Sequence, residues 1–351
     1  MCSSDLMTLT RYPNEFRGVL QDAVMQGASD IHFCAGQSPW IRVQGELFKL
    51  NQAEHAQQND QDSVALLDAL SPYIDTHLAK RLSQGYEIDF SFAVAGLGRF
   101  RANVFKSHRG IGAVLRHIRD AIPSLAEINT PKVLPDLLQS AGLFLVTGAT
   151  GSGKSTTLAA ILQHLNHTTR QHIITIEDPI EFIHTNQQCC VTQREIGHHS
   201  KSFAHALLAA LREDPDVILV GELRDLETIR LALTAAETGH LVLASLHTRS
   251  AAASVERIVD VFDSAEKALV RTQVSEALIG VVSQTLHRPV HSKKRQAAFE
   301  VMVATPAIRH LIREGKTSHI HNAIQTGASY GMQTMGQAMQ SAQSQTDAIA
   351  L

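Results

Sequence analysis

The sequence predicts an α/β protein in which a parallel-sheet domain follows a smaller α+β domain. Residues 148–155 read GATGSGKS, with the apolar segment AGLFLVT before them and the helical segment TTLAAILQHL after them. A strand, a glycine-rich loop and a helix in this order form a cradle for phosphate groups. From about residue 134 onward, apolar segments alternate with amphipathic ones, which is typical of a parallel sheet covered on both faces. Before residue 118, short strand-like and helical segments are mixed instead.

Length and composition agree with two globular domains and exclude several classes of protein. A chain of 351 residues suggests about two domains. The net charge of −3 gives no general attraction to nucleic acid, and no apolar run approaches the ~18 residues of a membrane span. The first residues lack the basic and apolar regions of a secretory signal. We therefore expect a cytoplasmic protein with no transmembrane segment and no nucleic-acid partner. The cysteines form no C-x-x-C pair and are expected to be free thiols: Cys2, Cys34, Cys189 and Cys190.

The first domain is predicted from a mixture of helical and strand-like segments. Apolar residues show helical spacing over about 14–26, and the strand IHFC follows. The segment PWIRVQGELFKL has strand character with Gly45 as a turn residue, and a helical region runs from about 61 to 83. Three strand-like segments, DFSFAVAG, GRFRANVFKS and GAVLRHI, complete a domain over residues 1–118. Residues 119–133, with two prolines, predict a linker before a second domain at 134–351.

The second domain begins with a predicted helix, VLPDLLQSA, which leads into the strand before the glycine-rich loop. Further strands are predicted at residues 172–178, 216–222 and 241–247, with helices between them such as FAHALLAALRE and LETIRLALTAAET. Ligands of such sheets bind at the carboxyl ends of the strands. Those ends are therefore the place to look for functional side chains.

The glycine-rich loop predicts a site for the phosphates of a nucleotide. Its glycines allow a tight turn whose backbone N–H groups, with the N-terminus of the next helix, face the ligand. Lys154 is expected to reach the β- and γ-phosphates, and Ser155 to hold Mg²⁺. The residues assigned to this site are Gly148, Ala149, Thr150, Gly151, Ser152, Gly153, Lys154, Ser155 and Thr156.

Carboxylates follow two of the predicted strands. IITIEDPIE places Glu177, Asp178 and Glu181 just after one buried strand, and VILVGELRD places Glu222 after another. Hydrolysis of a nucleotide needs a group that holds Mg²⁺ and one that orients or deprotonates water. We assign Glu222 to Mg²⁺, directly or through water, and Glu181 to the activation of water, with Glu222 as the alternative for that second role. Each carboxylate also has a purely structural interpretation, as a solvated residue at the N-terminus of a helix.

Two histidines accompany the third strand, LVLASLHT. His247 stands at its carboxyl end, and His240 comes just after Gly239 at the end of the preceding helix. We predict a catalytic role for both, together with Glu177, Glu181 and Glu222. For His240 the alternative is a contact that caps the C-terminus of that helix.

The chain resembles the PilT-type type IV pilus retraction ATPases of the type II/type IV secretion ATPase superfamily. The matching segments include GASDIHF, VTGATGSGKSTTLAAIL, TIEDPIEF, QREI, DPDVILVGELRD and AAETGHLVLASLHT, and the match spans about residues 27–335. In the terms of that superfamily, residues 148–155 form Walker A and 177–181 the Asp box. Walker B ends at Glu222, and 239–247 form the His box.

The resemblance implies a RecA-like P-loop NTPase domain preceded by a PAS-like domain, and a requirement for ATP and Mg²⁺. It also implies a homohexamer in which arginines of the first domain, Arg99, Arg101 and Arg116, meet the phosphates. The implied partners are an inner-membrane pilus platform protein and a paralogous pilus ATPase, and the implied location is cytoplasmic, peripheral to the inner membrane. The implied output is pilus disassembly and twitching motility.

The retraction branch is favoured by AIRHLIREGK at residues 307–316, which resembles a signature of that branch and places Ile308, Leu311 and Ile312 on one helical face. Assembly and secretion ATPases of the superfamily usually carry a tetracysteine zinc motif, which this chain lacks. Two alternatives stay open at this point. One is an assembly or type II secretion ATPase, and the other is a low-turnover, nucleotide-dependent accessory subunit of the retraction complex.

Overall fold

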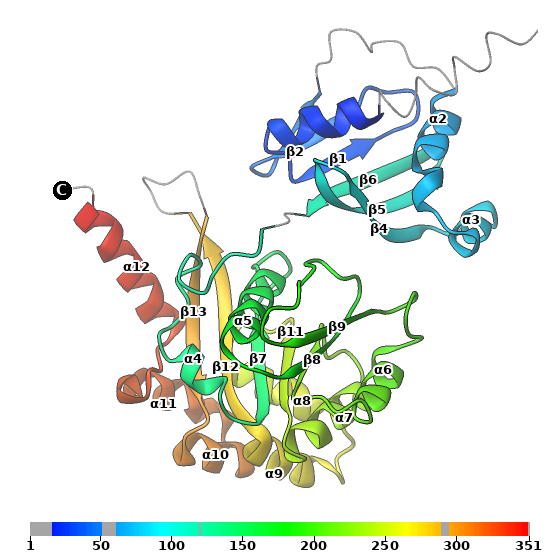
Figure 1. The fold of residues 1–351 in the computed structure, drawn as a ribbon. Coiled ribbons are helices and arrows are strands. Elements are labelled where there is room, and N and C mark those ends of the chain that lie inside the picture. Colours follow the sequence, from blue (N-terminus) through cyan, green and yellow to red (C-terminus); the bar gives the residue numbers. More distant parts are fainter. Residues whose placement is uncertain (1–15, 51–60, 119–120, 289–294, 350–351) are drawn as a thin grey trace, which may run out of the picture. The chain divides into compact units, whose positions relative to one another are not determined.

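The structure is a computed structural model, and it describes residues 16–50, 61–118, 121–288 and 295–349. The chain divides into two compact units, Met1–Ala121 and Ile122–Leu351 (Figure 1). Each unit is described by itself below. The assignment of residues 119–133 as a linker between domains stays a prediction, as do the limits 1–118 and 134–351.

The first unit contains a six-stranded antiparallel sheet in the order β3-β2-β1-β6-β5-β4. Along β5, Phe100, Ala102 and Val104 are buried while Arg99 and Arg101, which alternate with them, are not, which is the period of a half-buried strand. The buried face packs against a helix over residues 16–25 and against α2 and α3. The elements of this unit are β1 Asp30–Phe33, β2 Trp40–Val43, β3 Glu46–Lys49, α2 Gln61–Leu70, η1 Ser71–Tyr73, α3 Thr76–Ser83, β4 Ile88–Val94, β5 Gly98–Ser107 and β6 Gly110–Ile118.

These elements match the predicted α+β domain, with one difference. The helical region expected over about 61–83 is divided into α2 and α3 by a 3₁₀ turn at Ser71–Tyr73. Pro72 explains the break, because proline lacks the N–H that a continuous helix would use. The expected turn between β2 and β3 is formed by Gln44 and Gly45, both with positive φ.

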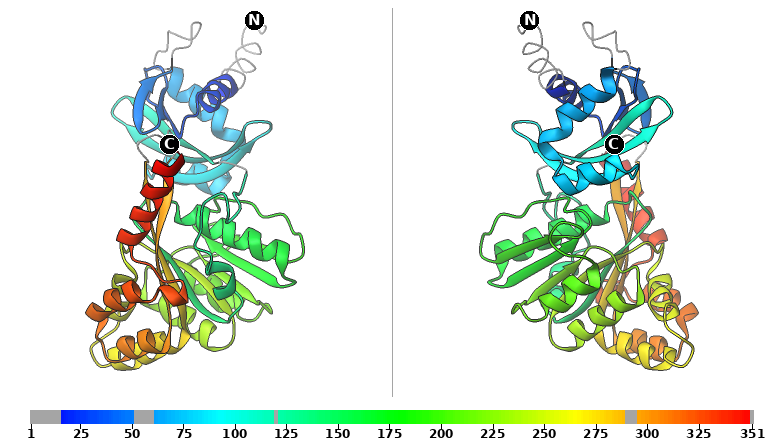
Figure 2. Two further views of the ribbon diagram at one scale, coloured as in Figure 1. Left: turned by 90° about the vertical axis from the view of Figure 1, so that its left-hand side faces the viewer. Right: turned by 90° about the vertical axis from the view of Figure 1, so that its right-hand side faces the viewer.

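The second unit contains a seven-stranded sheet in the order β13-β12-β7-β11-β10-β8-β9, in which only β13 runs antiparallel to its neighbour. One apolar cluster joins the sheet to α4 and α5, and another joins it to α6–α11, so helices cover both faces (Figure 1, Figure 2). The elements are α4 Leu134–Leu137, β7 Gly142–Thr147, α5 Lys154–Thr168, β8 His172–Glu177, β9 Cys190–Glu195, α6 Phe203–Ala210, β10 Val217–Val220, α7 Leu226–Glu237, β11 Leu241–Leu246, α8 Ala251–Asp260, α9 Lys267–Ala277, β12 Leu278–His287, β13 Gln296–Val303, α10 Pro306–Arg313, η2 Thr317–His319, α11 Ile320–Thr326, η3 Ala328–Tyr330 and α12 Met335–Ile349.

This architecture confirms the predicted α/β fold. The helix expected at VLPDLLQSA is a single turn, α4, because Gly142 already begins β7 a few residues later. Three strands, β9, β12 and β13, were not among the predicted elements.

The register of the parallel strands determines where the site lies. Thr147 of β7 pairs with Leu246 of β11, and Val220 of β10 pairs with both Ala244 and Ile176. The segments that follow β7, β11, β10 and β8 therefore leave the sheet at the same edge. The phosphate loop, His247, Glu222 and the segment after Glu177 all begin there.

Candidate functional site: the phosphate loop and the neighbouring strand ends

The glycine-rich loop has the backbone conformation of a phosphate cradle. Gly148, Gly151 and Gly153 have φ values of 149°, 76° and 90°, a region that side chains other than glycine disfavour. A Cβ atom on Gly148 would lie 2.4 Å from the Gln284 carbonyl oxygen, so only glycine fits between the loop and β12. Gly153 is the N-cap of α5 and provides no side-chain cap, so the first N–H groups of this helix are placed to meet an anion.

Strand β12 contacts the phosphate loop and supports it. Gln284, which is buried, donates a hydrogen bond from Nε2 to the carbonyl oxygen of Ser152. One residue earlier, the hydroxyls of Ser283 and Thr147 lie 2.7 Å apart. Gln284 was not predicted, because its role depends on a strand pairing between residues far apart in the chain.

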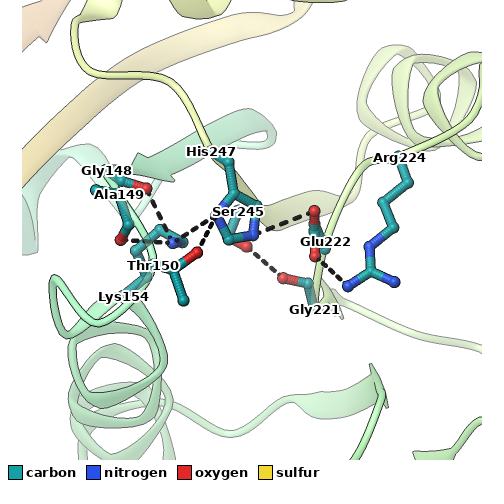
Figure 3. A network of polar contacts seen from close by, with 9 residues as sticks. All are labelled: Gly148, Ala149, Thr150, Lys154, Gly221, Glu222, Arg224, Ser245 and His247. Atoms are coloured by element: carbon teal, nitrogen blue, oxygen red, sulfur yellow. Dashed lines mark hydrogen bonds and ion pairs between the residues drawn. The ribbon is translucent and has the colours of Figure 1, made fainter.

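Lys154 is a buried cation held within the loop. It is 9% exposed, and Nζ donates to the carbonyl oxygens of Gly148 and Ala149 at 2.9 and 3.2 Å (Figure 3). Nζ also lies 3.4 Å from Nδ1 of His247. Burial lowers the pKa of Lys154, and the charges of Glu222 and Glu181 act in the opposite direction. A buried cation that contacts neutral carbonyls favours an anionic ligand.

The other predicted loop residues lie close to Lys154. The Thr150 hydroxyl lies 3.4 Å from the same nitrogen, Nδ1 of His247. Ser155 and Thr156 follow Lys154 in the first turn of α5.

Glu222 and His247 form the second part of the site. His247 Nε2 lies 3.2 Å from Oε1 of Glu222, and Arg224 Nη2 lies 2.8 Å from Oε2 (Figure 3). Burial raises the pKa of Glu222, but its hydrogen bond and ion pair with Arg224, together with His247, hold that pKa below its ordinary value. A continuous series of contacts thus joins Lys154, His247, Glu222 and Arg224. Arg224 was not predicted, although it stands two residues after Glu222 in the VGELRD segment.

Glu177 ends β8 in a different environment. Its Oε1 accepts a hydrogen bond of 2.7 Å from the Thr175 hydroxyl and one of 3.3 Å from Gln193 Nε2. Removal from water raises the pKa of Glu177 to about 7, although these hydrogen bonds oppose the shift. The charge of Glu181 raises the pKa of both Glu177 and Lys154, so this carboxylate lies within electrostatic reach of the loop. Asp178 is exposed, and its charge acts on Arg224.

The remaining predicted site residues lie elsewhere. His240 immediately precedes β11, at the amino end of the strand, whereas His247 follows its carboxyl end. Its Nδ1 lies 2.9 Å from the Ala235 carbonyl oxygen near the C-terminus of α7, which is the capping contact that was the structural alternative. The structure therefore does not bring His240 together with Lys154.

The three predicted arginines, Arg99, Arg101 and Arg116, lie on one sheet face of the first unit. Arg116 pairs there with Asp30 at 2.9 Å. Their role at the phosphates stays a prediction.

Three further observations concern metals, thiols and membranes. Within the described ranges, no group of three or more histidine, cysteine or acidic side chains is arranged to hold a metal ion. Cys34, Cys189 and Cys190 are free, and Cys2 lies outside the described residues. Among the helices that the structure describes, none has the length and apolar character needed to cross a bilayer.

Comparison with known proteins agrees with this geometry. The model of the family "Type II/IV secretion system protein" matches residues 12–349. The chain is 51% identical over 320 residues to the type IV pilus retractation ATPase PilT of Pseudomonas aeruginosa, covering 90% of each chain. It is 48% identical to a twitching motility protein of Neisseria gonorrhoeae, covering 89% of this chain and 81% of the relative.

Solved structures give the same assignment. The crystal structure of the pilus retraction motor PilT with bound ADP superposes with a TM-score of 0.84 at 41% identity, covering 93% of this chain and 92% of that one. The ATPase DotB of Legionella pneumophila superposes with a TM-score of 0.77 at 30% identity, covering 92% of this chain and 89% of that one. The phosphate loop, the acidic strand ends and these similarities agree, and the chain belongs to the type II/IV secretion system protein family.

Proposed function

We propose that this protein is a P-loop ATPase whose hydrolysis of ATP drives the retraction of a type IV pilus. The observation that carries the proposal is the series of contacts from Lys154 through His247 to Glu222, at the carboxyl ends of neighbouring strands. Relatives named as a pilus retractation ATPase and a twitching motility protein, at 51% and 48% identity, support the biological output.

Lys154 and the N-terminus of α5 bind the phosphates of the nucleotide, since both present positive charge to the same loop. Ser155 and Glu222 are the residues that would hold Mg²⁺, which neutralises charge between the β- and γ-phosphates when it is bound. Glu222 suits this role because its pKa is held low and it stays ionised.

Glu181 is the proposed base that orients and deprotonates the attacking water, with Glu222 as the alternative. His247 links Lys154 to Glu222, so it is placed to transmit the state of the phosphate loop to the Mg²⁺ ligand. Glu177 supports this edge of the site as a carboxyl group that is only partly ionised at neutral pH.

The motor is a homohexamer in which closure of one domain on the other accompanies binding, and residues 119–133 form the hinge. Arg99, Arg101 and Arg116 approach the phosphates on closure and stabilise the charge of the transition state. The ring acts in the cytoplasm on the inner-membrane platform protein of the pilus machine, and a paralogous pilus ATPase acts with it. A relative named type IV pilus ATPase PilU, 37% identical over 326 residues, illustrates such a paralogue.

Steady-state phosphate release by the purified full chain tests the enzymatic part of the proposal. We expect Lys154→Ala to abolish both hydrolysis and binding of a fluorescent ATP analogue, because it removes the cation of the loop. Glu222→Ala should abolish turnover while binding persists. Tight binding by the unchanged protein with negligible phosphate release would instead favour the low-turnover accessory subunit, and equal loss of affinity in both variants would contradict the assigned roles.

Counting surface pili after deletion of the gene tests the biological output. Excess pili support retraction, because disassembly has been removed. Loss of pili would favour the alternative, an assembly or secretion ATPase of the same family.

A further inference from the structure

Strand β9 is the edge strand beside β8, and its QREI segment entered the site described above only through the hydrogen bond from Gln193 to Glu177. In the parallel register, Gln193 lies opposite Thr175 and Glu195 opposite Glu177. Because side chains alternate along a strand, Thr175, Glu177, Gln193 and Glu195 share one face of the sheet. Arg194, between them, points to the other face, where it pairs with Glu213 at 2.8 Å.

Gln193 makes three hydrogen bonds to the segment that leaves β8. Its Nε2 donates to Oε1 of Glu177 at 3.3 Å and to the carbonyl oxygen of Phe182 at 2.9 Å. Its Oε1 accepts from the backbone N–H of His184 at 2.8 Å. One side chain therefore holds the start and the end of the 177–184 segment.

Glu195 holds the middle of the same segment. It is 8% exposed, and its Oε2 accepts a hydrogen bond of 3.0 Å from the backbone N–H of Ile180. Its own position is fixed, since its backbone N–H donates to Nδ1 of His199 and its Oε1 lies 3.5 Å from His198.

Glu181 lies between the two anchored residues. The residue before it, Ile180, is held by Glu195 through its N–H, and the residue after it, Phe182, is held by Gln193 through its carbonyl. A side chain on an irregular segment would otherwise sample many positions, and a displacement of about 1 Å in a catalytic group costs up to about 100-fold in rate. Both anchors come from a regular strand, which is the more rigid support.

We propose that Gln193 and Glu195 are positioning residues that fix Glu181 against the phosphate loop for the hydrolytic step. The inference rests on the proposed function, in which Glu181 activates water. It predicts that the two side chains affect turnover far more than nucleotide binding, since the contacts that bind phosphate come from a different loop.

The test compares variants of the full-length protein in steady-state hydrolysis, ADP affinity and backbone hydrogen exchange. Gln193→Met keeps the size of the side chain and removes its three hydrogen bonds. We expect kcat to fall about tenfold or more, ADP affinity to stay within about twofold, and exchange in residues 178–184 to become faster. Arg194→Met is the matched control on the same strand, and it should change none of these readouts.

Glu195 offers a conservative rescue. Glu195→Gln keeps an oxygen that accepts from Ile180, so kcat should remain within about threefold of the unchanged protein. Glu195→Met removes the acceptor and should behave like Gln193→Met. The proposal is overturned if Gln193→Met and Glu195→Met leave kcat unchanged, or if they lower ADP affinity as much as kcat.

A double variant separates this proposal from the proposed function. If Gln193 acts through Glu181, adding Gln193→Met to Glu181→Gln should reduce kcat no further. A full additional loss would overturn the positioning role while leaving the ATPase assignment intact. If the unchanged protein hydrolyses no ATP, the proposed function fails, and hydrogen exchange of residues 178–184 still decides whether the anchors hold the segment.

Discussion

Glu177 and Glu222 stand at the carboxyl ends of the paired strands β8 and β10, yet their surroundings shift their pKa values in opposite directions. Glu177 is held by the neutral groups of Thr175 and Gln193, and burial raises its pKa to about 7. Glu222 is also partly buried, but Arg224 and His247 hold its pKa below the ordinary value. Equivalent positions in a sheet therefore do not imply equivalent chemistry. The hydrogen bonds and ion pairs that a carboxylate makes set the direction in which its pKa moves.

The difference in charge between Glu177 and Glu222 is tested most strongly by replacing each carboxylate with its neutral amide. Glu222→Gln removes a charge that is present at neutral pH, so we expect kcat to fall by about 100-fold or more, the scale of a lost electrostatic contact at a transition state. Glu177→Gln replaces a group that is about half protonated near pH 7, and kcat should fall by less than about tenfold. Phosphate-release kinetics at pH 7 measure both. Equal losses would show that the difference in acidity is not functional.

The pH dependence of stability provides a second test. The pKa of Glu177 rises from 4.5 to about 7 on folding, so the folded chain keeps a proton that the unfolded chain has lost. The stability that this group contributes is present below pH 4.5 and is lost as the pH rises through 7. Glu177→Gln removes this dependence, and its free energy of unfolding relative to the unchanged protein should increase by about 2–3 kcal/mol between pH 5 and pH 8.

Urea unfolding of the purified chain at several pH values measures this difference. Glu314→Gln, at an exposed carboxylate near Lys316, serves as the control and should follow the unchanged protein. Curves for Glu177→Gln that stay parallel to the unchanged protein from pH 5 to pH 8 would contradict the raised pKa.

The smallest expected effect concerns Arg224. Arg224→Gln removes the cation that holds the pKa of Glu222 low, so the pKa of Glu222 should rise toward or above its ordinary value, because burial then acts with less opposition. We expect the acidic limb of the profile of kcat against pH to move to higher pH, with a loss of about two- to fivefold at pH 7. Arg194→Gln, whose partner is Glu213, is the control. An unmoved acidic limb would mean that Glu222 does not set it.

The sequence was most informative where one local pattern determines the structure. The glycine-rich loop and the apolar strands before Glu222 and His247 were predicted because glycine positions and apolar runs are local signals. Gln193 and Gln284 were not, because each acts through a contact across strands that no local pattern specifies. For His240 the order of the chain was a signal that was not used, because a residue that directly precedes a strand lies at its amino end, whereas ligands of a parallel sheet bind at the carboxyl ends.

Helix α10 contains both kinds of residue within one short segment: residues whose burial a local pattern predicts, and a residue whose role depends on contacts with another element. Ile308 and Ile312 are buried on one face, as helical spacing predicted. Arg309 belongs to the same helix, and no role was predicted for it. Its guanidinium donates to the carbonyl oxygens of Ala304, Ser275 and Glu276, so it caps the C-terminus of α9. That role depends on the packing of α9 against α10, which the sequence of the helix does not reveal.

The anchoring of residues 177–184 by Gln193 has a consequence for proton balance. His184, at the far end of this segment, is buried, and its pKa falls from 6.5 to about 4. Between about pH 4.5 and 6.5, folding thus removes a proton from the His184 imidazole and adds one to the Glu177 carboxyl group. The two changes have opposite signs and nearly cancel in the net uptake of protons. A mildly acidic medium therefore leaves the stability of this corner of the molecule almost unchanged.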